Sequence, residues 1–252
     1  MANDLPTTTV AGLQTVCLTR DQMADIMVED CLYAREHTVA PKVVFSSNGQ
    51  GISLNASNSQ FANAMAQADI IHADGQSVVL ASKLFTKKPI PERSATTDFF
   101  HNAAIKAQAA GLTFYMLGAN EEENKLACEN VNKLYPDLKI VGRRNGYFSR
   151  DQHPQIIEEI NKLKPDVLWV ALGKPKQEFW CIEMKSQLQV GWIKTCGGLY
   201  SFLAGTAPRA PQWMQDMSLE WLYRVLKAPK RLGWRYLTTN PHAMFLMMTK
   251  SK

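Results

Sequence analysis

The feature of the sequence that most constrains its fold is a series of short apolar runs, each followed by a segment rich in glycine and polar residues. The runs are KVVFSS (42–47), ADIIHAD (68–74), LTFYMLG (112–118), LKIVG (138–142), DVLWVALG (166–173) and GWIKTCGG (191–198). Several are apolar at consecutive positions, which is typical of strands covered on both faces of a parallel sheet. Because stretches of helical periodicity separate them, we predict an α/β fold with a Rossmann-like, doubly wound, mainly parallel sheet.

Charge is distributed unevenly along the chain. Residues 218–252 hold seven of the 28 Lys and Arg residues and a single acid, Glu220, whereas the rest of the chain is nearly neutral. This asymmetry predicts an anionic partner at one end of the molecule, either a phosphate-bearing ligand, an acidic lipid or a nucleic acid; a merely solvated basic helix is the alternative. We therefore divide the chain into a catalytic domain of residues 1–217 and a C-terminal helical appendage of residues 218–252.

The cysteines and the apolar segments indicate the cellular compartment in which the protein functions. The five cysteines are scattered and form no C-x-x-C pair, which disfavours both a disulfide framework and a zinc site. The N-terminus lacks the pattern of a secretory signal, and no stretch approaches the ~20 apolar residues that span a bilayer. These observations predict a cytoplasmic protein with free thiols.

Ligands of open α/β sheets bind at the carboxyl ends of the strands, so the segments after the apolar runs hold the candidate site. NGQGISL (48–54) suggests a dinucleotide fingerprint, but Leu54 stands where close helix packing needs Gly or Ala, and this disfavours an NAD(P)-dependent oxidoreductase. In GANEEE (118–123), Asn120 is expected to cap a helix, with or without a bound anion.

Two further segments carry candidate chemistry. Asp74 ends an apolar run, where partial desolvation suits a general base, although the spacing alone favours a helix-capping aspartate. In GKPKQEFW (173–180), Lys176 could hold a phosphate, and Gln177 could both donate to and accept from a sugar hydroxyl.

Arginines provide the remaining candidates. Arg209 lies in RAPQWM, and EWLYRVLKAPKRLGWRY (220–236) adds Arg224, Arg231 and Arg235 around Pro229, where we expect a helix break. The chain contains no D-x-D segment. An enzyme for sugar nucleotides built from this sequence would therefore neutralise diphosphate with Arg and Lys, so we expect neither a metal ion nor another cofactor.

The ordered segments ADGQSVVLASKL, ERSATTDFF, GKPKQEFW, GGLYSFLAGTAPRAPQWM and LEWLYRVLKAPKRLGWRY resemble the WecG/TagA/CpsF glycosyltransferases across roughly residues 10 to 240. The resemblance implies the GT-E type of Rossmann-like fold and metal-independent, inverting transfer from a UDP-sugar to a polyprenyl-diphosphate-linked saccharide. It also implies a peripheral location on the inner face of the cytoplasmic membrane. The donor sugar, which could be N-acetylmannosamine, its uronic acid or glucose, stays open, as does a homo-oligomeric state.

The resemblance also implies roles for individual residues. It makes Asp74 the catalytic base. The substrate-binding residues that it implies are Ser46, Asn48, Arg93, Asp98, Gln177, Arg224, Arg231 and Arg235. The chain departs from the family pattern at Ser46, which replaces Thr, at Ala95, which replaces Gly, and at Ser201, which replaces an Asp.

Two other classes of function are weighed against this one. A non-catalytic module that binds anions or nucleic acid would use the basic tail, but the near-neutral body and the lack of a nucleic-acid motif disfavour it, so no nucleic-acid partner is expected. The oxidoreductase is disfavoured by Leu54.

Overall fold

The structure of the chain, a computed structural model, describes residues 5–211, 213–214, 217 and 219–252; the side chain of Arg231 lies outside the described part. The central strands are β3 (Lys42–Ser47), β4 (Ile70–Ala73), β5 (Thr113–Gly118), β6 (Lys139–Arg144), β7 (Val167–Ala171) and β8 (Trp192–Thr195). They form one six-stranded sheet in the order β4-β3-β8-β7-β5-β6, and each neighbouring pair is parallel. Each strand begins in one of the apolar runs, and only β6 extends beyond its run, by two residues, which confirms the predicted fold class.

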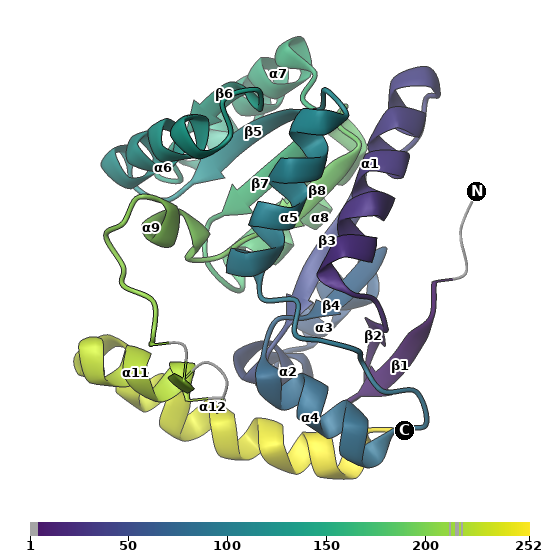
Figure 1. The fold of residues 1–252 in the computed structure, drawn as a ribbon, viewed down its shortest axis with the longest axis vertical. Helices are drawn as coiled ribbons and strands as arrows, with labels where there is room; N and C mark the ends of the chain where they lie inside the picture. The colour runs from purple at the N-terminus through teal and green to yellow at the C-terminus, as the bar shows by residue number, and fades with distance from the viewer. Residues whose placement is uncertain (1–4, 212, 215–216, 218) are drawn as a thin grey trace.

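Helices cover both faces of this sheet (Figure 1). One face packs against α1 (Arg20–Glu36), α5 (Thr96–Ala109), α6 (Glu121–Leu134) and α9 (Leu199–Leu203). The other packs against α2 (Gly49–Ser57), α3 (Ser59–Ala66), α4 (Gln76–Phe85), α7 (His153–Leu163) and α8 (Lys176–Met184). The short 3₁₀ turns η1 (Arg150–Gln152) and η2 (Lys185–Gln187) precede α7 and follow α8. The sheet is doubly wound, as the alternation of apolar runs and helical stretches in the sequence predicts.

Asparagine side chains begin two of the helices that follow strands. Asn48 caps α2 by accepting a hydrogen bond from the backbone N–H of Gly51 at 3.0 Å. Asn120 caps α6 by accepting from the N–H of Glu123 at 2.8 Å, as expected from the sequence. Such caps satisfy backbone donors that a helix leaves unpaired in its first turn. They fix the first turns of both helices at the carboxyl edge of the sheet.

An antiparallel hairpin that the sequence analysis did not identify precedes α1. It consists of β1 (Thr7–Val10) and β2 (Leu13–Val16), joined by Ala11 and Gly12. Both joining residues have positive φ angles, as the two-residue hairpin turns that match strand twist require. The backbone of Lys252 pairs with Thr9, donating at 3.0 Å and accepting at 3.3 Å, so the last residue of the chain lies beside β1.

The C-terminal segment forms two helices, α11 (Glu220–Lys227) and α12 (Pro229–Lys250), which lie across the lower end of the molecule in Figure 1. The expected break occurs at Pro229, the first residue of α12. The second half of α12 packs into the core, because Ala243, Leu246 and Met247 are buried with side chains of the second face. The division into a domain of residues 1–217 and an appendage of residues 218–252 stays a prediction.

Gly118, at the end of β5, provides a test of how tightly β5 and β7 pack. Its φ angle is +127°, and a Cβ atom there would overlap the backbone carbonyl of Ala171. We expect Gly118→Ala to lower the free energy of unfolding by about 2–4 kcal/mol, because backbone strain adds to overpacking. Urea-induced unfolding followed by circular dichroism measures the change.

Gly111→Ala is the matched control, because Gly111 also has a positive φ angle, +64°, but faces open space. It should cost only about 1 kcal/mol, the strain of a left-handed alanine. Equal losses for the two variants would contradict the packing argument.

Candidate functional site

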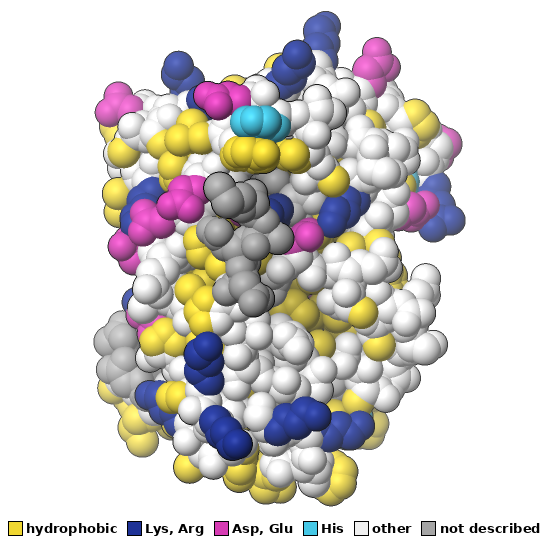
Figure 2. Space-filling view, turned by 90° about the vertical axis from the view of Figure 1, so that its right-hand side faces the viewer, with side chains coloured by type: hydrophobic (Ala, Val, Ile, Leu, Met, Phe, Trp, Pro, Cys, Tyr) yellow, Lys and Arg dark blue, Asp and Glu magenta, His cyan; other side chains and the backbone are white. Residues whose placement is uncertain are grey.

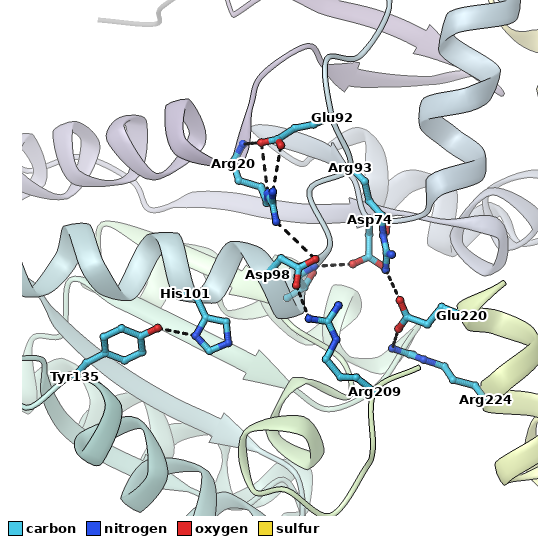
Figure 3. A network of polar contacts seen from close by, with 11 residues as sticks. Arg20, Asp74, Glu92, Arg93, Asp98, His101, Tyr135, Arg209, Glu220 and Arg224 are labelled. Atoms are coloured by element: carbon cyan, nitrogen blue, oxygen red, sulfur yellow. Dashed lines mark hydrogen bonds and ion pairs between the residues drawn. The ribbon is translucent and has the colours of Figure 1, made fainter. Parts of the chain in front are cut away.

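The candidate site is centred on Asp74, which follows β4 at the carboxyl edge of the sheet (Figure 3). Its Oδ1 accepts a hydrogen bond at 2.8 Å from the backbone N–H of Thr96, the first residue of α5. Its Oδ2 accepts a second one at 3.1 Å from the side-chain amide of Asn48, the cap of α2. Asp74 therefore does cap a helix, but this is α5 and not α4, the helix that follows it in the chain.

The surroundings of Asp74 keep its carboxylate ionised. Burial alone would raise the pKa of this half-buried carboxyl, but the hydrogen bond from Thr96, the positive charge of Arg93 and the amide of Asn48 together lower it below its usual value. His72 lies two residues earlier on β4, fully buried, and burial lowers the pKa of its imidazole, so this side chain is neutral at pH 7. Asp74 consequently carries a full negative charge at neutral pH.

A chain of charged groups connects Asp74 to the C-terminal segment (Figure 3). Arg93 donates from Nε to the backbone oxygen of Asp74 at 2.9 Å and from Nη2 to Glu220 Oε2 at 2.8 Å. Glu220, the first residue of α11, accepts with Oε1 from Arg224 Nη2, also at 2.8 Å. The guanidinium of Arg224 in turn lies 4.9 Å from the ring centre of Phe202 on α9. One carboxylate between two arginines thus holds α11 against the site.

Glu220 is buried, with 10% of its side chain exposed, against 19% for Arg93 and 36% for Arg224. Burial would raise the pKa of Glu220, but the neighbouring charges of Arg224 and Arg93 lower it. Because the pKa falls on folding, the ion pairs stabilise the docked tail above the usual pKa of a glutamate. That stabilisation is lost only as the pH falls through the lower, folded value.

A second group of charges lies beside the first, around the start of α5 (Figure 3). Asp98 Oδ1 accepts from Arg209 Nη1 at 2.5 Å, and Asp98 Oδ2 lies 3.7 Å from Arg20 Nη1. Arg20 also pairs with Glu92, the residue before Arg93. Asp98 and Arg209, which the sequence analysis named separately, are therefore direct partners, and Arg20 is an addition that the sequence did not suggest.

The loops after β3, β7 and β8 supply the remaining polar groups. Ser46 is buried near the end of β3, and its backbone oxygen accepts from Lys174 Nζ at 2.9 Å. Gln177 is buried in the first turn of α8, where its Oε1 accepts from the N–H of Gly197 at 3.1 Å. Its amide also donates to Glu178 Oε1 at 3.0 Å. Lys176 is exposed, so it is Lys174 that contacts the strand ends.

The structure links four of the eleven predicted residues in one network and pairs two others, Asp98 and Arg209, with each other. Asp74, Asn48, Arg93 and Arg224 belong to one connected network, whereas Arg235 lies on α12 with its guanidinium 4.7 Å from the ring centre of Tyr236. The prediction for Arg231 falls on a side chain outside the described part.

Besides Arg20, the sequence analysis missed Glu220 and Lys194 as charged residues of this region. Glu220 had a signal, because it is the single acid of a basic tail. Lys194 on β8 had one as well, because a lysine inside a strand of a covered sheet is uncommon. Lys194 is fully buried, its Nζ donates to the backbone oxygen of Thr195 at 2.5 Å, and burial lowers its pKa to about 8.

The described residues contain neither a metal-binding cluster nor a helix that could span a bilayer. None of their His, Cys, Asp and Glu side chains gather in threes that could hold a metal ion. Among the helices of the described part, none is both long and apolar enough to cross a bilayer.

Comparison with known proteins adds an independent observation. Residues 8–252 match the model of the "Glycosyl transferase WecG/TagA/CpsF family", so the match includes α11 and α12. A protein of Bacillus spizizenii named N-acetylglucosaminyldiphosphoundecaprenol N-acetyl-beta-D-mannosaminyltransferase is 32% identical over 73% of this chain and 70% of its own length. Proteins with the same name from Bacillus subtilis and Staphylococcus aureus are 26% and 27% identical, over 85% and 75% of this chain and 79% and 74% of theirs.

The bridge made by Glu220 generates a prediction about the docking of α11. In Glu220→Ala, Arg93 and Arg224 lose a shared counter-charge inside the contact, so the tail should open more easily by about 2–3 kcal/mol. Hydrogen exchange of the backbone amides of residues 219–227 measures this opening directly.

Glu183→Ala is the matched control, because the ion pair between Glu183 and Arg150 spans 3.3 Å at the surface. Its loss should change exchange in its own helix by less than about 0.5 kcal/mol and leave residues 219–227 unaltered. Wild-type exchange of α11 in Glu220→Ala would show that other contacts dock the tail.

Proposed function

The chain belongs to the WecG/TagA/CpsF family of glycosyltransferases, and we propose that it transfers N-acetylmannosamine from a UDP-sugar to N-acetylglucosamine linked to a polyprenyl diphosphate. The product is a lipid-linked precursor of a polysaccharide. Support comes from the names of the relatives, which specify undecaprenol as the lipid. N-acetylmannosamine was one of three donor sugars that the sequence left open. Membership of this family also sets aside the oxidoreductase and the nucleic-acid-binding module.

The observation that carries the proposal is the ionised carboxylate of Asp74 and the two arginines near it. Arg93 contacts the backbone of Asp74, and Arg93 and Arg224 both bind the carboxylate of Glu220. In the proposed reaction, the acceptor hydroxyl gives its proton to Asp74 and attacks C1 of the donor from the face opposite UDP. The relatives are named for β-linked transfer, and UDP-sugars carry an α linkage, so a single displacement inverts the anomeric carbon. One carboxylate is then sufficient.

The lowered pKa of Asp74 has a consequence for this reaction. A carboxylate with a low pKa is always available as a base but binds a proton weakly. The acceptor hydroxyl must therefore lose its proton late, when bond formation to C1 has already made it acidic. Departure of UDP then contributes much of the driving force, and stabilising the diphosphate becomes the main task of the site.

Arg93 and Arg224 are suited to hold that diphosphate. Both now contact Glu220, and a diphosphate carries more charge and more acceptor oxygens than one carboxylate, so it would compete for both guanidinium groups. In the proposal, Arg209, Arg231 and Arg235 supply further positive charge. Asp98 positions Arg209, while Ser46, Asn48, Lys176 and Gln177 surround the sugars. Transfer is proposed to proceed without a metal ion, and turnover in the presence of EDTA tests this.

The lipid-linked acceptor places the proposed reaction at the inner face of the cytoplasmic membrane. The C-terminal helices are the proposed contact with that surface, because Trp221, Trp234 and Leu237 are exposed on them among basic residues. Tryptophan and basic side chains together favour the interface between lipid head groups and acyl chains. Residues 218–252 would thus act as the membrane-associated part of a peripheral enzyme.

Replacement of the base tests the chemistry. We expect Asp74→Asn to lower kcat by about 10²- to 10⁴-fold, because the amide cannot accept the proton of the attacking hydroxyl. Release of UDP from UDP-N-acetylmannosamine, with a short polyprenyl-diphosphate-linked N-acetylglucosamine as acceptor, measures the rate. Turnover at the wild-type rate would refute the assigned base.

Asp166→Asn is the matched control, because Asp166 also accepts from a backbone N–H, that of Thr113 at 2.6 Å, but lies at the opposite edge of the sheet. Each variant should lose some stability, whereas only Asp74→Asn should lose turnover per folded molecule. Equal kinetic losses would assign the effect to destabilisation.

The pH dependence of kcat tests the protonation state of Asp74. Because its pKa is lowered, the carboxylate stays ionised until the pH falls below the ordinary value for aspartic acid, about 3.9. Between pH 5 and 8, about one unit above that value and more, we expect no acid limb in the profile of kcat. An acid limb centred near pH 6 would contradict this environment for Asp74.

A further inference from the structure

Helix α4 has an apolar face that no part of the described chain covers. The helix buries Val78, Val79 and Ala81 against the sheet. On its other side Leu80 and Leu84 are 45% and 73% exposed, and Phe85, the last residue of the helix, is 42% exposed. Residues 80 and 84 are one turn apart and therefore lie next to each other on the helix surface. A cluster of large apolar side chains at the surface usually marks a contact with a partner.

The charge around this face has one sign. Residues 75–91, which comprise α4 and the segment after it, contain Lys83, Lys87 and Lys88 and no acid. Helix α12 packs beside α4, and residues 221–252 also contain no acid. Figure 2 shows the result: the lower end of the molecule carries hydrophobic side chains along its edge with Lys and Arg side chains next to them.

The exposed residues of α12 extend the same surface. Its outward side chains Leu237, Met244, Phe245 and Met248 are each more than half exposed. They recur at helical spacing along α12. The opposite side of α12 packs against α2 and is buried in the core. Two adjacent helices thus present large apolar residues among basic ones.

Because all the charges on this surface are positive, they favour an anionic bilayer over a second copy of the chain as the partner. In a symmetric dimer the same patch would meet itself, so the lysines of one copy would face those of the other. An anionic bilayer has the opposite charge and an apolar interior, and it satisfies both components of the surface at once.

We propose that α4 and residues 86–91 form, together with α12, one continuous surface that binds anionic lipid bilayers. The lipid binding itself is inferred from exposure and charge. Only its role, which is to bring the site to a lipid-linked acceptor, rests on the proposed function. The catalytic core itself, and not just the C-terminal tail, then contacts the membrane.

The position of α4 gives the surface a consequence for the site. Gly75, the cap of α4, directly follows Asp74, and Leu84 lies near the other end of this helix of 10 residues. At about 1.5 Å per residue, these two positions lie roughly 15 Å apart along the helix axis. One helix therefore connects the proposed lipid-binding surface to the edge of the sheet that carries Asp74.

Leu84→Glu tests the surface without touching the site. Binding to sonicated vesicles of phosphatidylglycerol and phosphatidylcholine is measured by co-sedimentation. We expect the variant to bind on the order of tenfold or more weakly than the wild type, because an apolar contact is lost and a repelled charge is gained. Its melting temperature should stay at the wild-type value, since Leu84 is largely exposed.

Leu134→Glu is the matched control, because Leu134 is 61% exposed at the end of α6, far from α4 in Figure 1. It should bind vesicles as the wild type does. Wild-type binding by Leu84→Glu would overturn the proposal, and so would a change in sedimentation velocity without a change in vesicle binding, which would assign the surface to a second copy.

The two proposals fail separately. Absence of UDP release by the wild type with the short-chain acceptor would refute the proposed function and leave the vesicle result standing. Loss of vesicle binding confined to Leu84→Glu supports the membrane surface whichever sugar is transferred.

Discussion

The contact on which the candidate site depends is the carboxylate of Glu220 between the guanidinium groups of Arg93 and Arg224. It joins the loop before α5 to the first turn of α11, and Arg93 continues the connection to the backbone of Asp74. Without it, the tail would bring uncompensated positive charge to a region that already contains Arg209 and Arg20. An anion is thus a structural requirement at this position, and in the proposed reaction the diphosphate takes over that role from Glu220.

In the proposed reaction, a structural and a chemical role combine in the side chain of Asp74. Its two oxygens fix the starts of α2, through Asn48, and of α5, through Thr96. The same hydrogen bonds lower its pKa, so geometric precision is obtained at the expense of basicity. A fixed, weak base suits a reaction in which the leaving group, held by arginines, provides much of the driving force.

The sequence predicted the sheet because covered strands carry their own local signal. The hairpin β1–β2 was missed because its strands are four residues each and its Ala11–Gly12 turn lacks the common Asn-Gly pair. Asp74 was a candidate from its position after a strand, whereas Asn48 was named only through the family resemblance. The pairing of Glu220 with Arg93 spans 127 residues, and no local pattern encodes such a contact. The burial of Lys194 likewise follows from packing of the whole sheet.

The pairing of the last residues with the first hairpin bears on how the molecule is made. Ala11 donates to the side chain of Ser251 across 240 residues, and the backbone of Lys252 lies along Thr9. Contacts of such separation form late, since the intervening chain must be ordered first. The hairpin therefore gains its contacts with residues 250–252 only after the elements between them have folded. The sheet that carries Asp74 does not need these contacts, so it can assemble before the hairpin and residues 250–252 pair.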